Sequence, residues 1–578
     1  MTDDNPGPSW LKHFPLLADL RRSSGRALAQ DGIAGTITAI LLIPQALAYA
    51  LLAGLPPEVG LYASVLPVIV YALLGSSRVL AVGPVAVAAV MVSAALIPYA
   101  GDDPARYLTG ALILSGLSGV ILLAMAALKL GWLTHFISHP VLSGFTTGAA
   151  LYIVATQLSG LTGIPVPRDA GTDGIVAALF GGRDRLNSET LVFGLGAMVL
   201  LFAARAPLLK LLTSLGMQRE AAGSIGRTAP LLLVIASTVL SSVFDAHGRW
   251  GVAVVGEIPH GLPGLSLHFL AEDGWLQLLA PAAMIAIIGY VESISVAKAL
   301  AFRRQEKIDP DRELLALGST NVIAAIAGAM PVAGGFARSM VNYEAGARTQ
   351  LAAAVTALWV ALAALLFTGL LAPLPKAVLA AIIVVAVWQL VDFASLRHSW
   401  RYDRGDGAAQ AATTVGVLVF GVETGLMIGA GLSLLLFLYR TSRPHIAVIG
   451  QVGDSEHFRN VLRHDVRTWP ELLLLRIDET LYFANAPRVE SELQAHIVEA
   501  KQPKDVVLVM SGVAYIDTSG LDVLEALEMA LRQNGSRLHL AEVKGPVMDR
   551  LAGTDLLAAL GRGHVHLSVH EAVAAIRG

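Results

Sequence analysis

The run AAMIAIIGYVESISVAKALA (282–301) and the later segment AMPVAGGFARSMVN (329–342) decide the class of this chain. Both are apolar enough to lie within a bilayer, and they carry the ionisable residues Glu292 and Arg338. A charge at membrane depth costs at least ~2.5–3.5 kcal/mol on insertion scales, so such residues usually face a cavity or a substrate path. A carboxyl that carries a proton, beside a permanent cation, suits a coupled anion transporter.

The composition supports a membrane protein. Of the 578 residues 55% are hydrophobic and 15% are charged, whereas soluble globular proteins have about 25% charged residues. The net charge of −3 gives no indication of nucleic-acid binding. The absence of cysteine excludes disulfides and thiolate metal sites. We expect no metal, no cofactor and no enzymatic activity.

Apolar runs predict a transmembrane transport domain over 31–440, after a cytoplasmic segment 1–30. A span needs about 20 apolar residues, or fewer where a helix is broken inside the protein. The predicted spans are about fourteen: 31–53, 59–75, 84–99, 107–129, 138–160, 190–206, 228–244, 280–301, 312–329, 335–346, 351–371, 376–392, 408–421 and 424–440. Arg and Lys gather in alternate loops, which predicts a multi-pass protein of the cell (inner) membrane with both termini in the cytoplasm.

The two halves of this domain, about 31–245 and 280–440, resemble each other. LAVGPVAVAAVMV (80–92) and AMPVAGGFARSMV (329–341) are both short apolar segments that begin at Gly or Pro. Interrupted segments in corresponding positions are the best sequence indication of a site between inverted repeats. We expect half-helices to start at Gly83-Pro84 and at Gly334-Gly335. The free N–H groups and the helix dipoles of two such starts favour an anion.

Arg338 falls in the first turn of the second half-helix, where its planar donors suit a carboxylate or sulfate. The alternative is a structural ion pair with Glu292. Glu292 is the only acid placed well inside a span. Burial favours its neutral form and a neighbouring guanidinium favours its charged form, so it is a candidate proton carrier. The alternative is a Na⁺ ligand together with Ser293 or Ser295.

Residues 443–578 have the pattern of a small cytoplasmic α/β domain. HIAVIGQV, LLLLRI, LYFANA, DVVLVMS and RLHLAEV are predicted strands, and PRVESELQAHIVEA and SGLDVLEALEMALRQNG are predicted amphipathic helices. Asp517-Thr518-Ser519-Gly520 lies at a strand-to-helix junction, where Asp or Thr is first of all an N-cap. A phosphate added there would alter docking.

Several stretches resemble the sulfate permease (SulP) family of anion transporters along nearly the whole chain. They are IPQALAYALLAGLPPEVGLYASVLPVIVYALLGSSRVLAVGPVAV (43–87), YVESISVAKALA (290–301) and GGFARSMVNYEAGARTQL (334–351). The C-terminal LRIDETLYFANA (475–486) and YIDTSGLDVL (515–524) resemble a STAS domain, the usual cytoplasmic partner of these permeases.

The resemblance implies a polytopic helical fold of seven-plus-seven inverted repeats with core and gate subdomains, and a homodimer. It also implies an anion site between the third and tenth helices, with residues from the first and eighth. The positions that match the family's site are Gln45, Tyr49, Val85, Glu292, Arg338 and Ser339, and we expect Ala86 and Ala337 beside them to contact the substrate, with Glu292 as the residue for the coupling ion. Ala337 stands where many members have a serine. In STAS domains related to anti-sigma antagonists the position of Ser519 can be phosphorylated, and such a domain can recruit a cytoplasmic protein partner.

The leading hypothesis is proton-coupled import of sulfate or a similar divalent oxyanion such as a dicarboxylate. A sodium-coupled bicarbonate transporter is the first alternative. A nucleobase carrier of similar fold is disfavoured by the charge of Arg338. From another class, the chain is a membrane-anchored STAS signalling scaffold that moves nothing.

Overall fold

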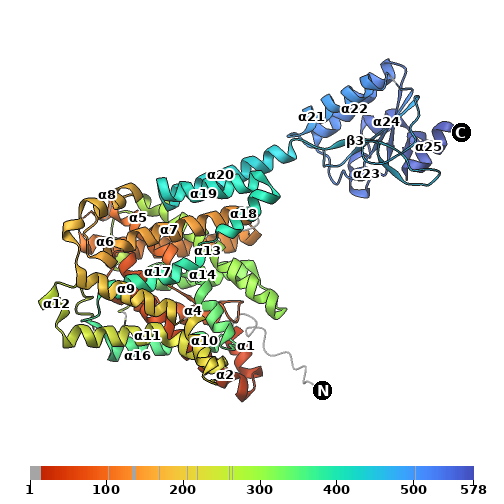
Figure 1. Ribbon diagram of the computed structural model, residues 1–578. Coiled ribbons are helices and arrows are strands. Elements are labelled where there is room, and N and C mark those ends of the chain that lie inside the picture. The colour runs from red at the N-terminus through yellow and green to blue at the C-terminus, as the bar shows by residue number, and fades with distance from the viewer. Residues whose placement is uncertain are drawn as a thin grey trace. The chain divides into compact units, whose positions relative to one another are not determined.

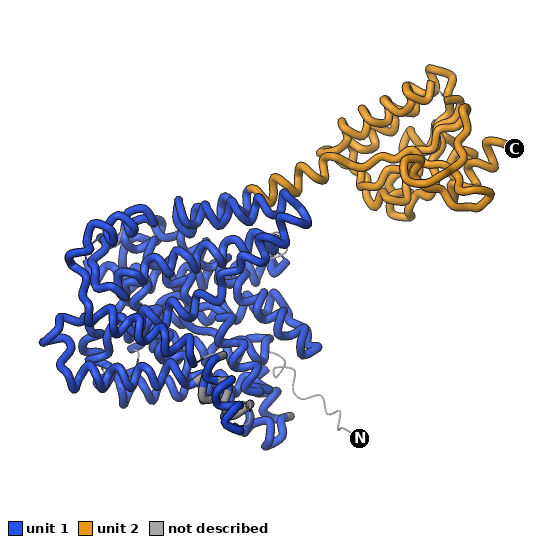
Figure 2. The backbone as a smooth tube through the Cα atoms, in the orientation of Figure 1, with its two compact units in different colours: residues 1–431 blue, residues 432–578 orange. Residues whose placement is uncertain are grey.

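The computed structural model describes residues 15–578 except 102, 133–137, 168–169, 205, 218, 260, 263 and 502. The first fourteen residues of the predicted N-terminal segment therefore lie outside the described part. The chain separates into two compact units, 1–431 and 432–578 (Figure 2). The boundary between them falls within helix α20 (Val422–Thr441).

The first unit is built from helices packed side by side (Figure 1). In the described part of the chain, seven helical segments are long and apolar enough to cross a membrane. They are α2 (Gly25–Leu52), α3 with α4 (Pro57–Tyr62, Leu66–Leu74), α6 (Pro104–Ala127), α7 (His139–Thr162), α13 (Trp275–Arg304), α17 with α18 (Lys376–Val387, Phe393–Tyr402) and α20.

Further helices complete this unit. The apolar ones among them are α5 (Ala86–Ala100), α8 (Thr172–Gly181), α9 (Ser188–Ala203), α16 (Leu351–Leu366) and, from Thr228 onward, α11 (Arg219–Val243); the remaining ones are α1 (Pro15–Arg22), α10 (Ala206–Ser214), α12 (Ala246–Trp250), α14 (Pro310–Ile326), α15 (Phe336–Glu344) and α19 (Arg404–Phe420). Each of the fourteen predicted spans coincides with a helix, and the second is divided into α3 and α4. The division lies at Ala63–Val65, just before Pro67, because proline is accepted in the first turn of a helix but not in its interior.

Two buried dipeptide strands of this unit form a short antiparallel pair, named the strand crossing. Strand β1 (Val82–Gly83) pairs antiparallel with β2 (Ala333–Gly334), and Val82 faces Gly334 in the register. Helix α5 begins directly after β1, and α15 begins directly after β2. The predicted half-helix starts are thus within three residues of the observed ones, and the pairing brings two distant parts of the sequence to one place.

Two further buried acids were not expected. Asp31 and Glu313 lie near the ends of predicted spans, and both side chains are fully buried. Asp31 accepts hydrogen bonds from the backbone N–H groups of Arg348 and Thr349 and from the Thr349 hydroxyl. Buried carboxylates persist where such donors replace water. Both acids therefore hold loops in place, and neither was singled out from the sequence because each lies at the end of a predicted span.

The second unit is a six-stranded sheet covered by helices, in the order β4-β3-β5-β6-β7-β8. Strand β3 pairs antiparallel with β4 and β5, and the pairs from β5 to β8 are parallel. The strands are β3 (Ile446–Gln451), β4 (Phe458–Asn460), β5 (Leu472–Ile477), β6 (Asp505–Val509), β7 (Arg537–Ala541) and β8 (Val565–His566); the helices are α21 (Ala486–Glu499), α22 (Thr518–Gln533), α23 (Gly545–Leu551), α24 (Asp555–Leu560) and α25 (Val569–Arg577).

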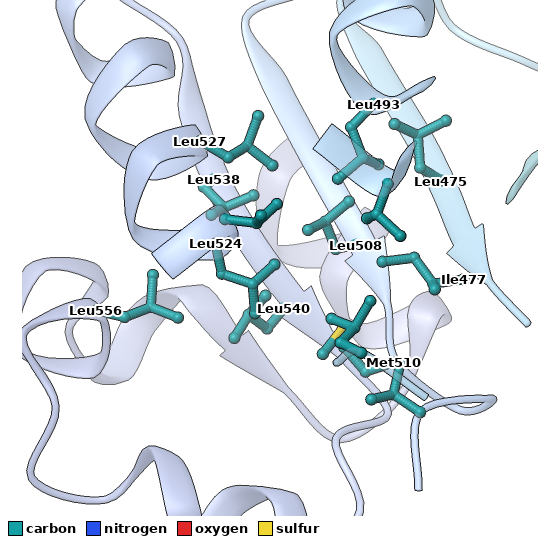
Figure 3. Packing of buried hydrophobic residues seen from close by; sticks show 14 of the residues in the cluster. Leu475, Ile477, Leu493, Leu508, Met510, Leu524, Leu527, Leu538, Leu540 and Leu556 are labelled. Carbon is teal, nitrogen blue, oxygen red and sulfur yellow. The ribbon is translucent and has the colours of Figure 1, made fainter. Parts of the chain in front are cut away.

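The second unit has its own hydrophobic core. Leu475 and Leu508 from the sheet pack with Leu493 of α21 and Leu524 of α22 (Figure 3). A second cluster on the other face joins Val507 and Val509 to α25. Both clusters draw only on residues of this unit.

One predicted strand of this unit is wrong. LYFANA (481–486) forms a turn that leads into α21, and only Leu481 makes an isolated bridge, to Ile516. The buried side chain of Asn485 closes the turn: it accepts from the Tyr482 N–H and donates to the Thr480 carbonyl. An asparagine that satisfies nearby backbone groups in this way competes with a strand ladder.

Candidate functional site

A cavity of about 50 Å³ lies where the two half-helices begin. Its lining brings together seven of the eight residues predicted for the anion and the coupling ion: Gln45 and Tyr49 of α2, Val85 and Ala86 at the start of α5, Glu292 of α13, and Ala337 and Arg338 of α15. These residues come from four separate parts of the sequence. The crossing of β1 and β2 is what makes them neighbours.

Arg338 lies on a cradle of two glycines. A Cβ atom at Gly83 would be 3.2 Å from Nη1 of Arg338, and one at Gly335 would be 2.9 Å from Nη2. The guanidinium therefore rests against bare backbone from two distant parts of the sequence. Glycine is the residue that permits so close an approach.

The two terminal nitrogens of Arg338 lack protein partners. The residue is only 2% exposed, yet Nη1 and Nη2 have no hydrogen-bond partner in the described part of the chain. Buried polar groups are normally satisfied, because leaving one unpaired is costly. An orphaned, buried guanidinium that lines a small cavity is a receptor for an anionic group.

The helix starts add to the positive potential at this cavity. The N-caps of α5 and α15 are Val85 and Gly335, and neither has a side chain that accepts a hydrogen bond. The first N–H groups of an α-helix have no partner within the helix, and the dipole places partial positive charge there. Two such starts and one guanidinium favour an anion in the space between them.

Glu292 lines the same cavity and is partly buried. It makes no hydrogen bond with Nη1 or Nη2 of Arg338, so the structural ion pair considered as an alternative is not formed through those atoms. The neighbouring Ser293 hydroxyl donates to the Gly289 carbonyl and accepts from the Gly334 N–H. Ser295 donates to the Val291 carbonyl.

Ser339 is the predicted site residue that the structure places elsewhere. It is fully buried and is absent from the lining of the cavity. Its hydroxyl donates to the Gly335 carbonyl at 2.7 Å and accepts from the Ala81 N–H at 2.9 Å. Both functions of the hydroxyl are thus used by backbone groups of the strand crossing.

Apolar residues of a distant segment close the cavity. Ala386 and Val387 at the end of α17, and Leu390 just after it, line one wall. The sequence predicted an apolar span over 376–392, but nothing in it distinguished these three apolar residues from their neighbours. Only the packing of α17 against α2 brings them to the site.

A larger vestibule of about 450 Å³ adjoins the cavity. Leu41, one turn before Gln45 on α2, and Glu344, the last residue of α15, line it. The vestibule therefore extends along α2 from the cavity toward the end at which that helix begins. The two spaces share Gln45, Phe336, Ala337 and Ala386.

In the second unit, Asp517 is the N-cap of α22, as expected from the sequence. Its carboxylate accepts from the Gly520 N–H at 2.9 Å and from the Phe483 N–H at 2.8 Å. Ser519 lies partly buried in the first turn of this helix. The structure thus places Ser519 at a positive helix end, where a phosphate would be stabilised.

Comparison with known sequences identifies both units. The sequence profile of the sulfate permease family matches residues 28–413, and that of the STAS domain matches 463–572. The chain is similar to the chloroplastic sulfate transporter 4.1 of Arabidopsis thaliana, with 33% identity over 94% of this chain and 79% of the relative. It is also similar to a probable sulfate transporter of Mycobacterium tuberculosis H37Rv, with 33% identity over 97% and 98%.

Solved structures share the fold. A structure of SLC26A9 aligns with a TM-score of 0.89 at 22% identity, over 98% of this chain and 93% of that one. The transmembrane domain of the cyanobacterial bicarbonate transporter BicA aligns with a TM-score of 0.59 at 23% identity, over 70% and 98%. The predicted class, a helical transporter domain joined to a small α/β STAS domain, is confirmed.

Proposed function

The chain belongs to the sulfate permease family and is a multi-pass anion transporter, not an enzyme, and on that premise we propose that it imports sulfate together with protons. The observation that carries this proposal is the buried guanidinium of Arg338, whose Nη1 and Nη2 have no protein partner. A planar pair of donors matches two oxygens of a divalent oxyanion better than it matches a spherical halide.

The size of the cavity supports sulfate over a dicarboxylate. The cavity has a volume of about 50 Å³, a few times the minimum of about 10–15 Å³ that a single water molecule requires. A compact anion with four oxygens suits such a space. A dicarboxylate has two charged ends several bonds apart, so its second end would have to lie outside this cavity, in the adjoining vestibule and away from Arg338.

Glu292 is the proposed proton carrier. A dianion held by Arg338 would add negative charge in the cavity that Glu292 lines, which favours the neutral carboxylic acid. Proton and sulfate would then bind with positive coupling, and the coupling must be reciprocal. The hydrogen bonds of the Ser293 hydroxyl support a proton over Na⁺, since they leave this oxygen poorly placed as a ligand of a cation.

The vestibule is the proposed inner access route. It extends toward the end of α2 at which the chain enters the domain, and the distribution of Arg and Lys predicts that this end is cytoplasmic. We place the protein in the cell (inner) membrane with both termini in the cytoplasm, as a homodimer. The STAS domain would then meet its protein partner in the cytoplasm.

Uptake by purified protein in proteoliposomes tests this function. The panel is labelled sulfate, succinate, fumarate and bicarbonate, each with an imposed pH gradient or an imposed Na⁺ gradient. We expect sulfate accumulation driven by an inward proton gradient. Sodium-driven uptake of bicarbonate would replace the proposal with the first alternative, and no uptake of any anion by folded protein would favour the signalling scaffold.

Glu292→Gln separates binding from coupling in the same assay. The amide mimics the neutral acid in shape and cannot release a proton. We expect this variant to bind sulfate and exchange it across the membrane, but to lose acceleration by the proton gradient. Full gradient-driven accumulation by the variant would show that the proton route lies elsewhere.

A further inference from the structure

Two buried serines stabilise the strand crossing, and each makes the same two kinds of hydrogen bond. Ser293 of α13 donates to the Gly289 carbonyl four residues earlier at 2.5 Å, and accepts from the Gly334 N–H at 2.7 Å. Ser339 of α15 donates to the Gly335 carbonyl four residues earlier, and accepts from the Ala81 N–H. Both side chains are fully buried.

Each serine holds the strand that leads to one glycine of the Arg338 cradle. Gly334, held by Ser293, directly precedes Gly335, and Ala81, held by Ser339, lies two residues before Gly83. The bond to its own helix fixes the rotation of each hydroxyl. A lone pair of the oxygen then points at the strand.

We propose that Ser293 is a positioning residue, which sets where the guanidinium of Arg338 lies relative to Glu292. Ser293 directly follows Glu292 on α13. Its hydroxyl is also bonded to Gly334 of β2, the strand that leads into α15 and Arg338. One hydroxyl thus joins the element that carries the proposed proton to the element that carries the proposed anion ligand. This inference rests on the proposed function, and it gives Ser293 a part in coupling the binding of the proton to the binding of sulfate.

The structure offers a matched control in Ser295. It lies on the same helix, and its hydroxyl also donates to a carbonyl four residues earlier, that of Val291, at 2.6 Å. Ser295 is exposed, and among the described residues its hydroxyl has no bond to β2. Removing each hydroxyl therefore changes the same local bond, and only Ser293→Ala also releases the Gly334 N–H.

The test measures the sulfate Kd of purified wild type, Ser293→Ala, Ser293→Thr and Ser295→Ala at acid and at alkaline pH. We expect Ser293→Ala to weaken binding about tenfold, the effect of leaving one buried N–H unpaired, and to reduce the ratio between the two Kd values. Ser293→Thr keeps a hydroxyl and should recover part of the affinity. Ser295→Ala should stay within about twofold of wild type, since it leaves no backbone N–H of β2 unpaired.

A purely stabilising role of Ser293 would give a different result. Ser293→Ala would then lower the melting temperature while the folded fraction kept the wild-type Kd and pH dependence, and the proposal would be overturned. The Arg338→Ala variant distinguishes a failure of the proposed function from a failure of the positioning role. If that variant binds sulfate normally, the proposed function fails, whereas if it loses binding and Ser293→Ala does not, only the positioning role fails.

Hydrogen exchange of the wild-type protein provides a test that needs no variant. The Gly334 amide should exchange among the slowest amides of the membrane domain, because its acceptor is a buried oxygen. Exchange as fast as that of an exposed loop amide would show that the Ser293–Gly334 bond is not maintained, which overturns the proposal even if the Ser293 variants do not fold.

Discussion

Gly335 and the guanidinium of Arg338 lie so close that no side chain fits between them. A Cβ atom at Gly335 would be 2.9 Å from Nη2 and 3.1 Å from Nε of Arg338. The backbone of Gly335 has φ −93° and ψ 128°, a conformation that any residue adopts. Glycine is therefore required here by the approach of the guanidinium and not by the backbone.

Gly335→Ala should consequently displace Arg338 without straining the chain. We expect sulfate affinity to fall by about tenfold, since charged hydrogen bonds lose strength steeply when they are misaligned, while the protein remains folded. Gly196→Ala is the control, because a Cβ atom at Gly196 meets nothing within 4 Å. Sulfate binding to both purified variants measures this effect. Equal affinities of Gly335→Ala and Gly196→Ala would show that the cradle has no role in binding.

Ala337→Ser should strengthen the site. Ala337 lines both the cavity and the vestibule, and a hydroxyl there would add one donor in the first turn of α15. A hydrogen bond to a charged group contributes about 1.5–3 kcal/mol at most, and we expect a gain of about threefold to tenfold in sulfate affinity. A Ser variant that binds more weakly than the wild type would mean that the anion does not reach α15 at this position.

Glu313→Gln should destabilise the membrane domain without changing sulfate affinity. The carboxylate accepts from the Ser76 N–H, the Ser76 hydroxyl, the Ser77 N–H and the Tyr71 hydroxyl. The amide oxygen can still accept from Ser76 and Ser77, but its NH₂ group would face the Tyr71 hydroxyl, and all four bonds would lose the strength that the charge gives them, at a cost of about 1–3 kcal/mol. Thermal unfolding in detergent measures this loss, with the exposed Glu257→Gln as control. Unchanged stability would show that these bonds are not all made.

Much of this architecture was predictable because glycine, proline and buried charge have few roles inside a membrane. The half-helix starts followed from Gly83-Pro84 and Gly334-Gly335, and Glu292 and Arg338 stood out as ionisable residues within apolar segments. The direction in which a side chain points was harder to predict from the sequence. Ser339 adjoins Arg338 in sequence, yet its hydroxyl is used by the backbone.

The remaining errors have local causes. LYFANA (481–486) has strand-forming residues, but Asn485 satisfies the backbone of a turn and ends the extended pattern. Ala386 and Val387 join the cavity through the packing of α17 against α2, which leaves no mark in an apolar run. Small apolar residues that close a site are invisible to motif reasoning for this reason.

The STAS domain should lose stability as the pH falls below neutrality. Burial lowers the pKa of His539 to about 4. The hydrogen bond between its Nε2 and the Asp505 carboxylate opposes this shift, and the neighbouring His564 and His566 add to it. The pKa of His566 is also lowered by burial. Because the unfolded rings take up protons near pH 6.5, stability is complete above that pH and declines toward pH 4 by up to about 1.4 kcal/mol per pH unit for His539.

Urea unfolding of residues 443–578, which contain both hydrophobic clusters of the second unit, measures this decline. His539→Gln should flatten the pH dependence between pH 6.5 and 4, because the residue that resists protonation is gone. His570→Gln changes an exposed histidine of α25 and should leave the dependence unchanged. A wild-type domain with constant stability over this range would contradict the buried, neutral state of His539.

The central claim is that the unpartnered guanidinium of Arg338 holds the transported anion. Equilibrium binding of labelled sulfate to purified wild type, Arg338→Ala and Arg338→Lys tests it most directly, with size-exclusion profiles to establish that each variant is folded. We expect no measurable binding of sulfate to Arg338→Ala. We expect binding to be at least tenfold weaker in Arg338→Lys, because lysine keeps the charge but loses the planar pair of donors. A folded Arg338→Ala variant with near wild-type affinity would contradict the central claim.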